Sequence, residues 1–452
     1  MISAAMTLFA SMSSPNNRLF PDSLAFSLHG AAQAVAAVGD GVALPQALAR
    51  VWIKTSASPQ ARGAIQDLSY HCMRNMGRAE ALLNAMTTKQ TEPPILHGLI
   101  CCALGVLSDP DEQGDSPRYN TFTLVDQAVT AAASDTEMAH AKGMVNAILR
   151  RFLREREALM KSAAGTQMAL WNYPNWWIDR MRSAYPQDWQ AILESGNQAP
   201  PLTLRINRRK TSIDSYLETL SAQGIEASRI GPDAVRLTQA TPVSQIPGFE
   251  EGVVSVQDAG AQLAADLLDV QDGMRVLDAC AAPGGKTGHI LERADVELIA
   301  LDHDAQRLKR IDENLQRLQL SATLLTGDAG DTDWWDGQPF DRILADVPCT
   351  ASGIVRRHPD IRWLRRKTDT TQLASISAGI LDNLWQMLKP NGKLLFVTCS
   401  LWPQESEAQA AAFAARHEDA VRQQAPGQLL PSATADRDHD GLFYALFHKP
   451  AA

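Results

Sequence analysis

Cysteine is scarce in this 452-residue chain, and long apolar runs are missing from it. The six cysteines form no CxxC pair and no Cys/His spacing suited to zinc, which argues against a disulfide scaffold and against a metal site. No stretch approaches the roughly 18 uncharged apolar residues of a membrane span. The segment 1–17 has no basic residue and only a short apolar run, so we do not expect a signal peptide. Together these absences predict a protein of the reducing cytoplasm, where free thiols persist.

Positive charge is in the minority. The formal net charge is -9 and the pI is about 5.6, which argues against indiscriminate binding to nucleic acid. A nucleic-acid enzyme can still be acidic overall if its basic residues are concentrated where the substrate lies. With 45% hydrophobic residues, the chain has enough apolar material for two or three folded domains.

Hydrophobic periodicity divides the chain into three parts. Residues 20–165 repeat apolar positions at helical spacing and predict an all-α domain. Residues 166–252 begin with an aromatic cluster at 171–177, which we interpret as a domain-packing patch, and continue as a small α+β subdomain. Over 253–450, strands alternate with helices, which is typical of an α/β domain with a mostly parallel sheet.

The sequence contains two basic clusters, each of which is compatible with two different roles. Four arginines between residues 150 and 156 lie near the end of a predicted helix, where they suit either a solvated face or an RNA-phosphate contact. Arg205 and the basic run 208–210 give the α+β subdomain a basic edge, which is compatible with RNA binding or with an ordinary surface turn.

A loop of small residues follows the first clear strand of the α/β region. The strand 275–279 runs into the loop Cys280-Ala281-Ala282-Pro283-Gly284-Gly285-Lys286 and then into a helix. Small residues between a strand end and a helix N-terminus let a cofactor approach the backbone closely. The end of this loop resembles a phosphate-binding loop, but Cys280 stands where that pattern needs glycine, so a nucleotide triphosphatase is disfavoured.

Carboxylates end the strands that follow. Asp302 comes about 20 residues after the loop, at the distance where an acidic side chain accepts hydrogen bonds from ribose hydroxyls. Asp328 and Asp346 end the next two strands. Each carboxylate alone fits an ordinary turn. Because all three lie at one edge of a parallel sheet, together with the loop they predict a cofactor site.

Two cysteines also occupy strand ends. Cys349 follows the strand 341–345 through an Asp-Val-Pro turn, and Cys399 follows the strand 393–398. A cysteine in such a place is most often a small buried hydrophobe. Two of them at the carboxyl ends of two strands, beside the expected cofactor, point instead to thiol chemistry.

The chain resembles a known family at these motifs. DACAAPGGKT (278–287), DVPC (346–349) and TCS (398–400) are similar to the motifs of the RNA cytosine-5 methyltransferases of the NOL1/NOP2/Sun family. RRHPDIRW (356–363), NQAPPLTLRIN (197–207) and a NusB-like helical N-terminal domain resemble the bacterial Sun/RsmB branch. That resemblance implies S-adenosyl-L-methionine as cofactor and cytosine 967 of 16S ribosomal RNA as target, modified before or during assembly of the small subunit. It also implies an α/β Rossmann-like catalytic domain.

The chemistry of such a family requires a nucleophile, an acid and a release step. Cytosine carbon 5 is a poor nucleophile, so a thiolate must first add at carbon 6. The resemblance assigns this role to Cys399 and the release step to Cys349. Asp346 is the candidate acid that stabilises the base through its ring nitrogen or exocyclic amine.

A basic run follows directly after Cys349. On an isolated helix it would be a solvated face, but beside an active site it favours contact with RNA phosphates. The residues that we expect to contact RNA are Arg205, Arg356, Arg357, His358 and Arg362.

Three alternatives remain open. A DNA cytosine-5 methyltransferase would share the base chemistry but would use the Pro-Cys thiol, so Cys399 disfavours it. A non-catalytic RNA-binding scaffold would need neither cysteine. A methyltransferase acting on a different RNA would keep every motif.

Overall fold

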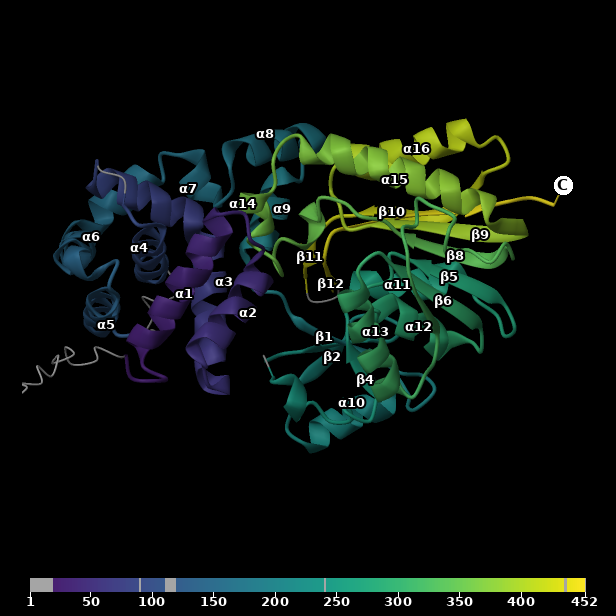
Figure 1. Cartoon of the computed structure of the whole chain (residues 1–452), viewed down its shortest axis with the longest axis horizontal. Coiled ribbons are helices and arrows are strands. Elements are labelled where there is room, and N and C mark those ends of the chain that lie inside the picture. Colours follow the sequence, from purple (N-terminus) through teal and green to yellow (C-terminus); the bar gives the residue numbers. More distant parts are fainter. Residues whose placement is uncertain (1–18, 89–90, 110–118, 240, 435–436, 452) are drawn as a thin grey trace, which may run out of the picture. The chain divides into compact units, whose positions relative to one another are not determined.

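The computed structural model describes residues 19–88, 91–109, 119–239, 241–434 and 437–451. The chain forms two compact units, Met1–Asn172 and Tyr173–Ala452 (Figure 1). The segment 1–17, in which we expect no signal peptide, lies outside the described residues. None of the described helices is long and apolar enough to cross a membrane.

The first unit is helical, as the periodicity predicts. Ser23, Ser58 and Asn120 cap helix N-termini with side-chain oxygens that accept backbone N–H groups, which explains where those helices begin. The helix Pro94–Leu107 is buried along most of its length and forms the centre of the unit. The helices are α1 (Leu24–Gly39), α2 (Leu44–Thr55), α3 (Pro59–Met86), α4 (Pro94–Leu107), α5 (Thr121–Ser134), α6 (Lys142–Ala163) and α7 (Gln167–Trp171).

The second unit begins with two helices and a small antiparallel sheet. The helices are α8 (Asn175–Ala184) and α9 (Trp189–Asn197). The sheet has the order β2-β3-β1-β4, and α10 (Ile213–Ala222) packs on it through Tyr216 and Leu220. Its strands are β1 (Leu202–Ile206), β2 (Ala227–Arg229), β3 (Ala234–Leu237) and β4 (Val254–Val256).

A seven-stranded sheet forms the rest of the second unit. Its order is β10-β13-β9-β8-β5-β6-β7. The five strands from β9 to β7 pair in parallel, and β13 and β10 add an antiparallel edge. The strands are β5 (Arg275–Ala279), β6 (Glu297–Asp302), β7 (Thr323–Thr326), β8 (Phe340–Asp346), β9 (Leu388–Thr398), β10 (Val421–Leu429) and β13 (Leu442–His448). The mostly parallel α/β architecture is confirmed.

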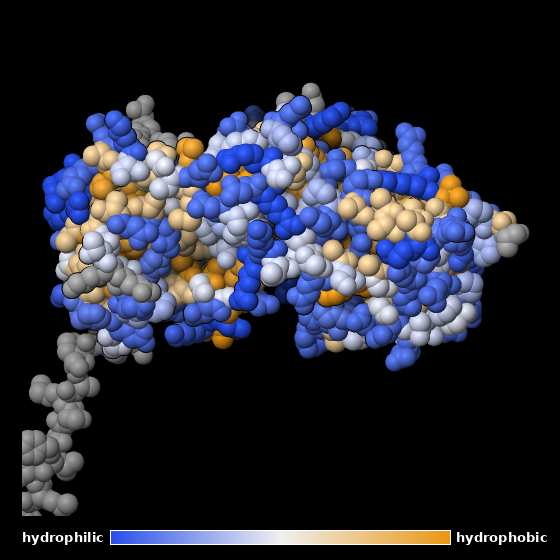
Figure 2. Space-filling model, turned by 90° about the horizontal axis from the view of Figure 1, so that it is seen from above, coloured by the Kyte–Doolittle hydropathy of each residue, from blue (hydrophilic) through white to orange (hydrophobic). Residues whose placement is uncertain are grey.

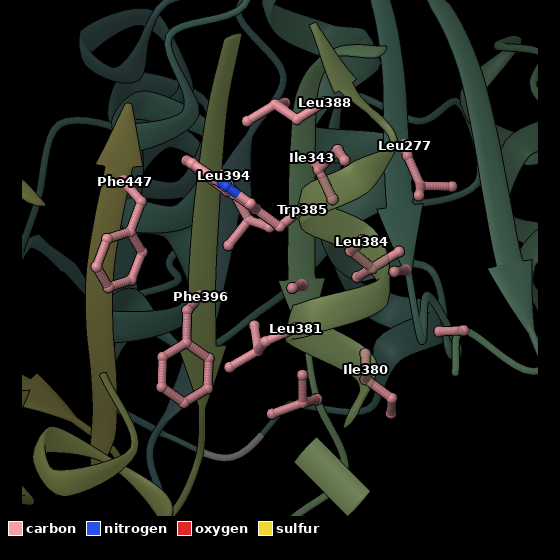
Figure 3. Packing of buried hydrophobic residues seen from close by; sticks show 14 of the residues in the cluster. Leu277, Ile343, Ile380, Leu381, Leu384, Trp385, Leu388, Leu394, Phe396 and Phe447 are labelled. Atoms are coloured by element: carbon pink, nitrogen blue, oxygen red, sulfur yellow. The ribbon is translucent and has the colours of Figure 1, made fainter. Parts of the chain in front are cut away.

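Helices cover both faces of this sheet (Figure 1). On one face lie α11 (Ala259–Leu268), α12 (Gly285–Arg293) and α13 (Ala305–Leu318). On the other lie α15 (Asp369–Gln386) and α16 (Glu407–Arg416). Figure 3 shows Leu381, Leu384 and Trp385 of α15 against Leu394 and Phe396 of β9. These apolar contacts fix the central strands, and with them the strand ends.

On the face that Figure 2 draws, hydrophilic residues predominate. Figure 2 shows apolar residues in small separate groups on the face that carries α15 and α16. Ile376 of α15, with 45% of its surface exposed, is one of the few large apolar side chains to reach solvent there. Scattered exposure of this kind needs no binding partner to explain it.

Candidate active site

The glycine loop follows β5 and enters α12. Cys280 and Gly284 both have positive φ angles, 60° and 92°, which turn the chain sharply between strand and helix. A Cβ atom at Gly284 would lie 3.1 Å from Ile311, so the position favours glycine on two counts. The backbone N–H of Ala282 donates to Asp302 at the end of β6, at 3.0 Å. The loop is therefore held at the carboxyl edge of the sheet.

The surroundings of this loop suit a positively charged ligand. Burial, followed by the negative charges of Asp346, Asp302, Asp278 and Asp328, raises the pKa of the Cys280 thiol. Four carboxylates thus act on one short loop, and two of them have cationic neighbours: Lys286 pairs with Asp346, and Arg307 lies 3.7 Å from Asp302. S-adenosyl-L-methionine carries a sulfonium and an ammonium group, and the residues present fit it by charge and by the room that small side chains leave.

The three predicted carboxylates differ in their settings. Asp302 is buried, and its oxygens already accept the N–H groups of Ala282 and Asp304, so it shapes the loop. Asp328 is exposed beyond β7. Asp346 is partly exposed and accepts a hydrogen bond from Lys286 Nζ at 2.7 Å.

Lys286 links the cofactor loop to the cysteines. Burial acts to lower the pKa of its ammonium group, but the charge and the hydrogen bond of Asp346 raise it. The same ammonium group acts to lower the pKa of Cys399, against the larger effects of Cys349 and of burial, which raise it. A permanent positive charge therefore lies near the thiols.

The two cysteines lie side by side. Since β8 and β9 are neighbouring parallel strands, Cys349 and Cys399 follow them at the same edge, with their Sγ atoms 3.4 Å apart. A hydrogen bond from Cys399 and another from the N–H of Ala351 lower the pKa of Cys349, although burial opposes them. The hydrogen bond to Cys349 and burial raise the pKa of Cys399. The first proton leaves this pair more easily than it would leave a lone buried thiol.

Exposure distinguishes the two thiols. Cys349 is buried, with 9% of its surface exposed, whereas Cys399 is only half-buried. As a residue, Cys399 is therefore the more exposed of the two. The sequence predicted that both cysteines would reach this edge, and the geometry brings them together with Asp346.

The buried Glu405 is absent from the residues predicted for the site. It lies in the short 3-10 helix η5 (Pro403–Glu405), and its carboxylate bonds to residues that follow each cysteine, Thr350 and Ser400. The only local indication in the sequence is its position six residues after Cys399, and a glutamate at such a position is typical of an ordinary turn.

Three arginines expected to contact RNA are instead buried. Arg356 bonds Asp438 at 2.8 Å and Asp440 at 2.5 Å. Arg362 donates to the carbonyl of Gly196 at 2.6 Å, and its guanidinium carbon lies 3.8 Å from the centre of the Tyr173 ring.

Arg205 is equally enclosed. Its guanidinium group forms a two-pronged ion pair with Glu292 at 2.6 and 2.9 Å, and it also donates to Gln257 and to the carbonyl of Gly285. With 1%, 1% and 0% of their surfaces exposed, Arg205, Arg356 and Arg362 are not available to phosphates. The expectation that they contact RNA is thereby corrected.

The other basic residues are more accessible. Arg357 is partly exposed but pairs with Asp258 and Asp440, and His358 is partly buried, which lowers its pKa. Further along the run, Arg366 and Lys367 are exposed. These two are the members of the basic run that solvent reaches most freely.

Two members of the aromatic cluster, Tyr173 and Trp177, pack against the catalytic part of the second unit. Trp177 of α8 is fully buried and its ring centroid lies 5.1 Å from that of Trp402, three residues after Cys399. Tyr173 is also buried, beneath Arg362. The interpretation as a packing patch agrees with this arrangement.

A metal-ligand arrangement occurs once among the residues that the structure describes. Glu80, His97 and Cys101, in the first unit, bring one ligand atom each within 4.8 Å of one another. His97 Nε2 lies 2.8 Å from Glu80 and 3.5 Å from Cys101, so an ion pair with a neighbouring thiol accounts for the cluster.

Comparisons with known proteins agree with this geometry. Residues 265–448 match the family model of the 16S rRNA methyltransferase RsmB/F, and residues 173–244 match the ferredoxin-like domain of the same proteins. Ribosomal RNA small subunit methyltransferase B of Vibrio vulnificus is 39% identical over 90% of this chain and 95% of its own length. The enzyme of that name from Cronobacter sakazakii is 41% identical over 88% and 92%.

Solved structures share the fold. PH0851 superposes with a TM-score of 0.76 over 95% of this chain and 99% of its own, at 21% identity. A methyltransferase homologue from Pyrococcus horikoshii superposes with a TM-score of 0.54 over 62% and 97%, at 26% identity. By its sequence, its sheet topology and its cofactor loop, this chain belongs to the RsmB/F family of S-adenosyl-L-methionine-dependent 16S rRNA methyltransferases.

Proposed function

We propose that the protein transfers a methyl group to carbon 5 of a cytosine in 16S ribosomal RNA, cytosine 967 by family resemblance, through a covalent adduct with Cys399. The observation that carries the proposal is the pair of thiols 3.4 Å apart, at adjacent strand ends beside Asp346 and Lys286. A methyltransferase that acts on a more nucleophilic atom needs no thiol there. Bound S-adenosyl-L-methionine supplies an electrophilic methyl group.

The thiol pair explains how the nucleophile forms. Cys399 is the more accessible thiol, but Cys349 has the lower pKa. As the Cys399 sulfur bonds to carbon 6, its proton passes across the hydrogen bond to the Cys349 thiolate. The ring nitrogen takes up a proton by way of Asp346, which Lys286 resupplies across their 2.7 Å hydrogen bond, so no net negative charge stays on the base. Electron density then moves to carbon 5, which takes the methyl group.

Release restores the aromatic base. The proton on carbon 5 must leave, and the bond between Cys399 and carbon 6 must break. Cys349, once it has passed its own proton to solvent, is the base placed for this step. The electrons of the carbon–hydrogen bond re-form the ring double bond and expel the Cys399 thiolate.

RNA recognition is assigned to surfaces outside the thiol pair. We propose three domains: residues 20–165 bind RNA, residues 166–252 form a linking subdomain, and residues 253–450 form the catalytic domain. Arg366 and Lys367 are exposed shortly after Cys349 and suit phosphate contacts. Arg357 and His358 remain candidates at the margin of the site.

The test is mass-spectrometric mapping of 5-methylcytosine in unmodified 16S RNA after incubation with the cofactor. Wild type should modify one cytosine, and Cys399→Ala should modify none and form no adduct. Cys349→Ala should form the adduct more slowly, because it lacks the proton acceptor, but should accumulate it as a covalent protein–RNA complex, seen as a retarded band on a denaturing gel. Cys102→Ala, which removes a buried thiol from the first unit, is the matched control and should behave as wild type.

Three results would contradict the proposal. An adduct with Cys399→Ala, together with none for Cys349→Ala, would exchange the roles of the two thiols. Cofactor binding without methylation of 16S RNA would indicate a different RNA. Failure to bind the cofactor at all would favour a non-catalytic scaffold.

A further inference from the structure

The segments that carry the two cysteines meet at one buried carboxylate. Glu405 has 2% of its surface exposed. One carboxylate oxygen accepts the backbone N–H of Thr350 at 2.9 Å. The other accepts the hydroxyl groups of Thr350 and Ser400, both at 2.5 Å. Thr350 directly follows Cys349, and Ser400 directly follows Cys399, so a single side chain bridges both loops.

This carboxylate is an unusual group to bury. Burial raises the pKa of Glu405, and the three hydrogen bonds that it accepts oppose that rise. Its negative charge also raises the pKa of Cys349, which works against thiolate formation. A group that disfavours the thiolate electrostatically must have another reason to be there. Its hydrogen bonds supply one.

Other contacts reinforce the same junction without replacing it. The N–H of Gly353 donates to the carbonyl of Cys399 at 2.8 Å, and the N–H of Leu401 donates to Ser352 Oγ at 2.7 Å. The first contact reaches the backbone of Cys399 itself, and the second joins residues beyond those that directly follow the cysteines. Glu405 is the side chain that joins the two residues directly after the thiols.

We propose that Glu405 is a positioning residue that holds the Cys349 and Cys399 loops together and so sets the separation of their thiols. It touches neither sulfur and acts through Thr350 and Ser400. The consequence for catalysis rests on the proposed function, whereas the effect on the thiol pair does not depend on it.

The direction in which the pKa of Cys349 changes in Glu405 variants distinguishes a positioning role of Glu405 from an effect of its charge alone. Glu405→Gln keeps the shape, and its amide can accept from the Thr350 N–H and donate to the two hydroxyl oxygens. It removes only the negative charge, so the pKa of Cys349 should fall. Glu405→Ala removes charge and bridge together. Since the hydrogen bond from Cys399 is the largest influence on Cys349, its loss should raise that pKa.

The experiment measures the pH dependence of alkylation of Cys349 and Cys399 by iodoacetamide, peptide by peptide, in the full chain without RNA or cofactor. We expect the midpoint for Cys349 to move up in Glu405→Ala and down in Glu405→Gln. If the alanine variant fails to fold, Thr350→Val takes its place. This variant removes one hydroxyl donor and keeps the carboxylate, and it should also move the Cys349 midpoint up. Glu407→Ala, at an exposed glutamate two residues away, is the matched control and should leave the midpoint unchanged.

Methylation assays complete the test. Glu405→Ala should lower kcat by about 100-fold with little change in the KM for the cofactor, because misplacing a reacting group by about 1 Å has an effect of that size. Glu405→Gln should lose only a few-fold. A downward shift of equal size in both variants would overturn positioning and leave Glu405 as a charge alone. If no RNA is methylated even by wild type, the alkylation result still decides the proposal.

Discussion

Replacing Arg205 by alanine should destabilise the second unit strongly. Arg205 lies on β1 of the small sheet, whereas Glu292 lies on α12, directly after the cofactor loop. Both side chains are almost fully buried, at 1% and 2% exposure. The substitution removes all four hydrogen bonds of the guanidinium group and leaves the Glu292 carboxylate buried without its cation.

The magnitude follows from what is left behind. Breaking a buried ion pair by removing one partner costs about 3–5 kcal/mol, because the remaining charge is desolvated without compensation. Replacing both partners by apolar residues of similar size is often close to neutral. Arg205→Met with Glu292→Leu should therefore recover most of the loss. The single variant should also loosen the cofactor loop, since the carbonyl of Gly285 loses its donor.

Urea unfolding is monitored through the hydrogen exchange of peptides from β1 and α12. These peptides report on the second unit separately from the first. Arg209→Ala is the matched control, because Arg209 forms an exposed pair with Asp295 and should cost at most about 1 kcal/mol. A loss of less than about 1 kcal/mol for Arg205→Ala would refute the reasoning. So would a double variant that is no more stable than the single one.

Two further changes probe other parts of the fold. Burial lowers the pKa of His289 from 6.5 to about 3, with Asp233 3.8 Å away, so stability should be lost as pH falls below 6.5. Lowering the pH from 6.5 to 5 should cost about 2 kcal/mol in urea unfolding, and a His289→Gln variant that keeps the same dependence would contradict this. Gly353→Ala would place a Cβ atom 2.1 Å from the carbonyl oxygen of Gly441 and 2.9 Å from that of Cys399. Methylation should fall by about 100-fold through displacement of the thiol loop, and wild-type turnover by this variant would count against that packing.

The strands and the site edge could be predicted from the sequence because their signals are local. Short stretches with apolar residues at their centre, such as 275–279 and 393–398, form buried strands, and polar or small residues mark where each ends. Parallel pairing then brings the loops after them to one edge. The glycine loop, Asp346, Cys349 and Cys399 all follow from that rule.

Residues whose partners are distant in the chain could not be predicted in this way. Arg356 appeared to belong to a basic surface run, yet its partners, Asp438 and Asp440, lie more than 80 residues further on. Arg205 pairs with Glu292 across 87 residues. From sequence alone, a charged residue is predicted to be exposed unless its counterion is known. The antiparallel edge formed by β10 and β13 was missed for a related reason, because pairing depends on partners and not on local pattern.

The sheet brings the two cysteine-bearing loops next to each other. Neighbouring strands run about 4.8 Å apart wherever a sheet forms. Cys349 and Cys399 each follow one of two such neighbours, β8 and β9, which pack against the apolar core beneath α15. The two loops are thus adjacent because of the regular spacing of the backbone, and the Glu405 bridge has only the final separation of the sulfurs to set.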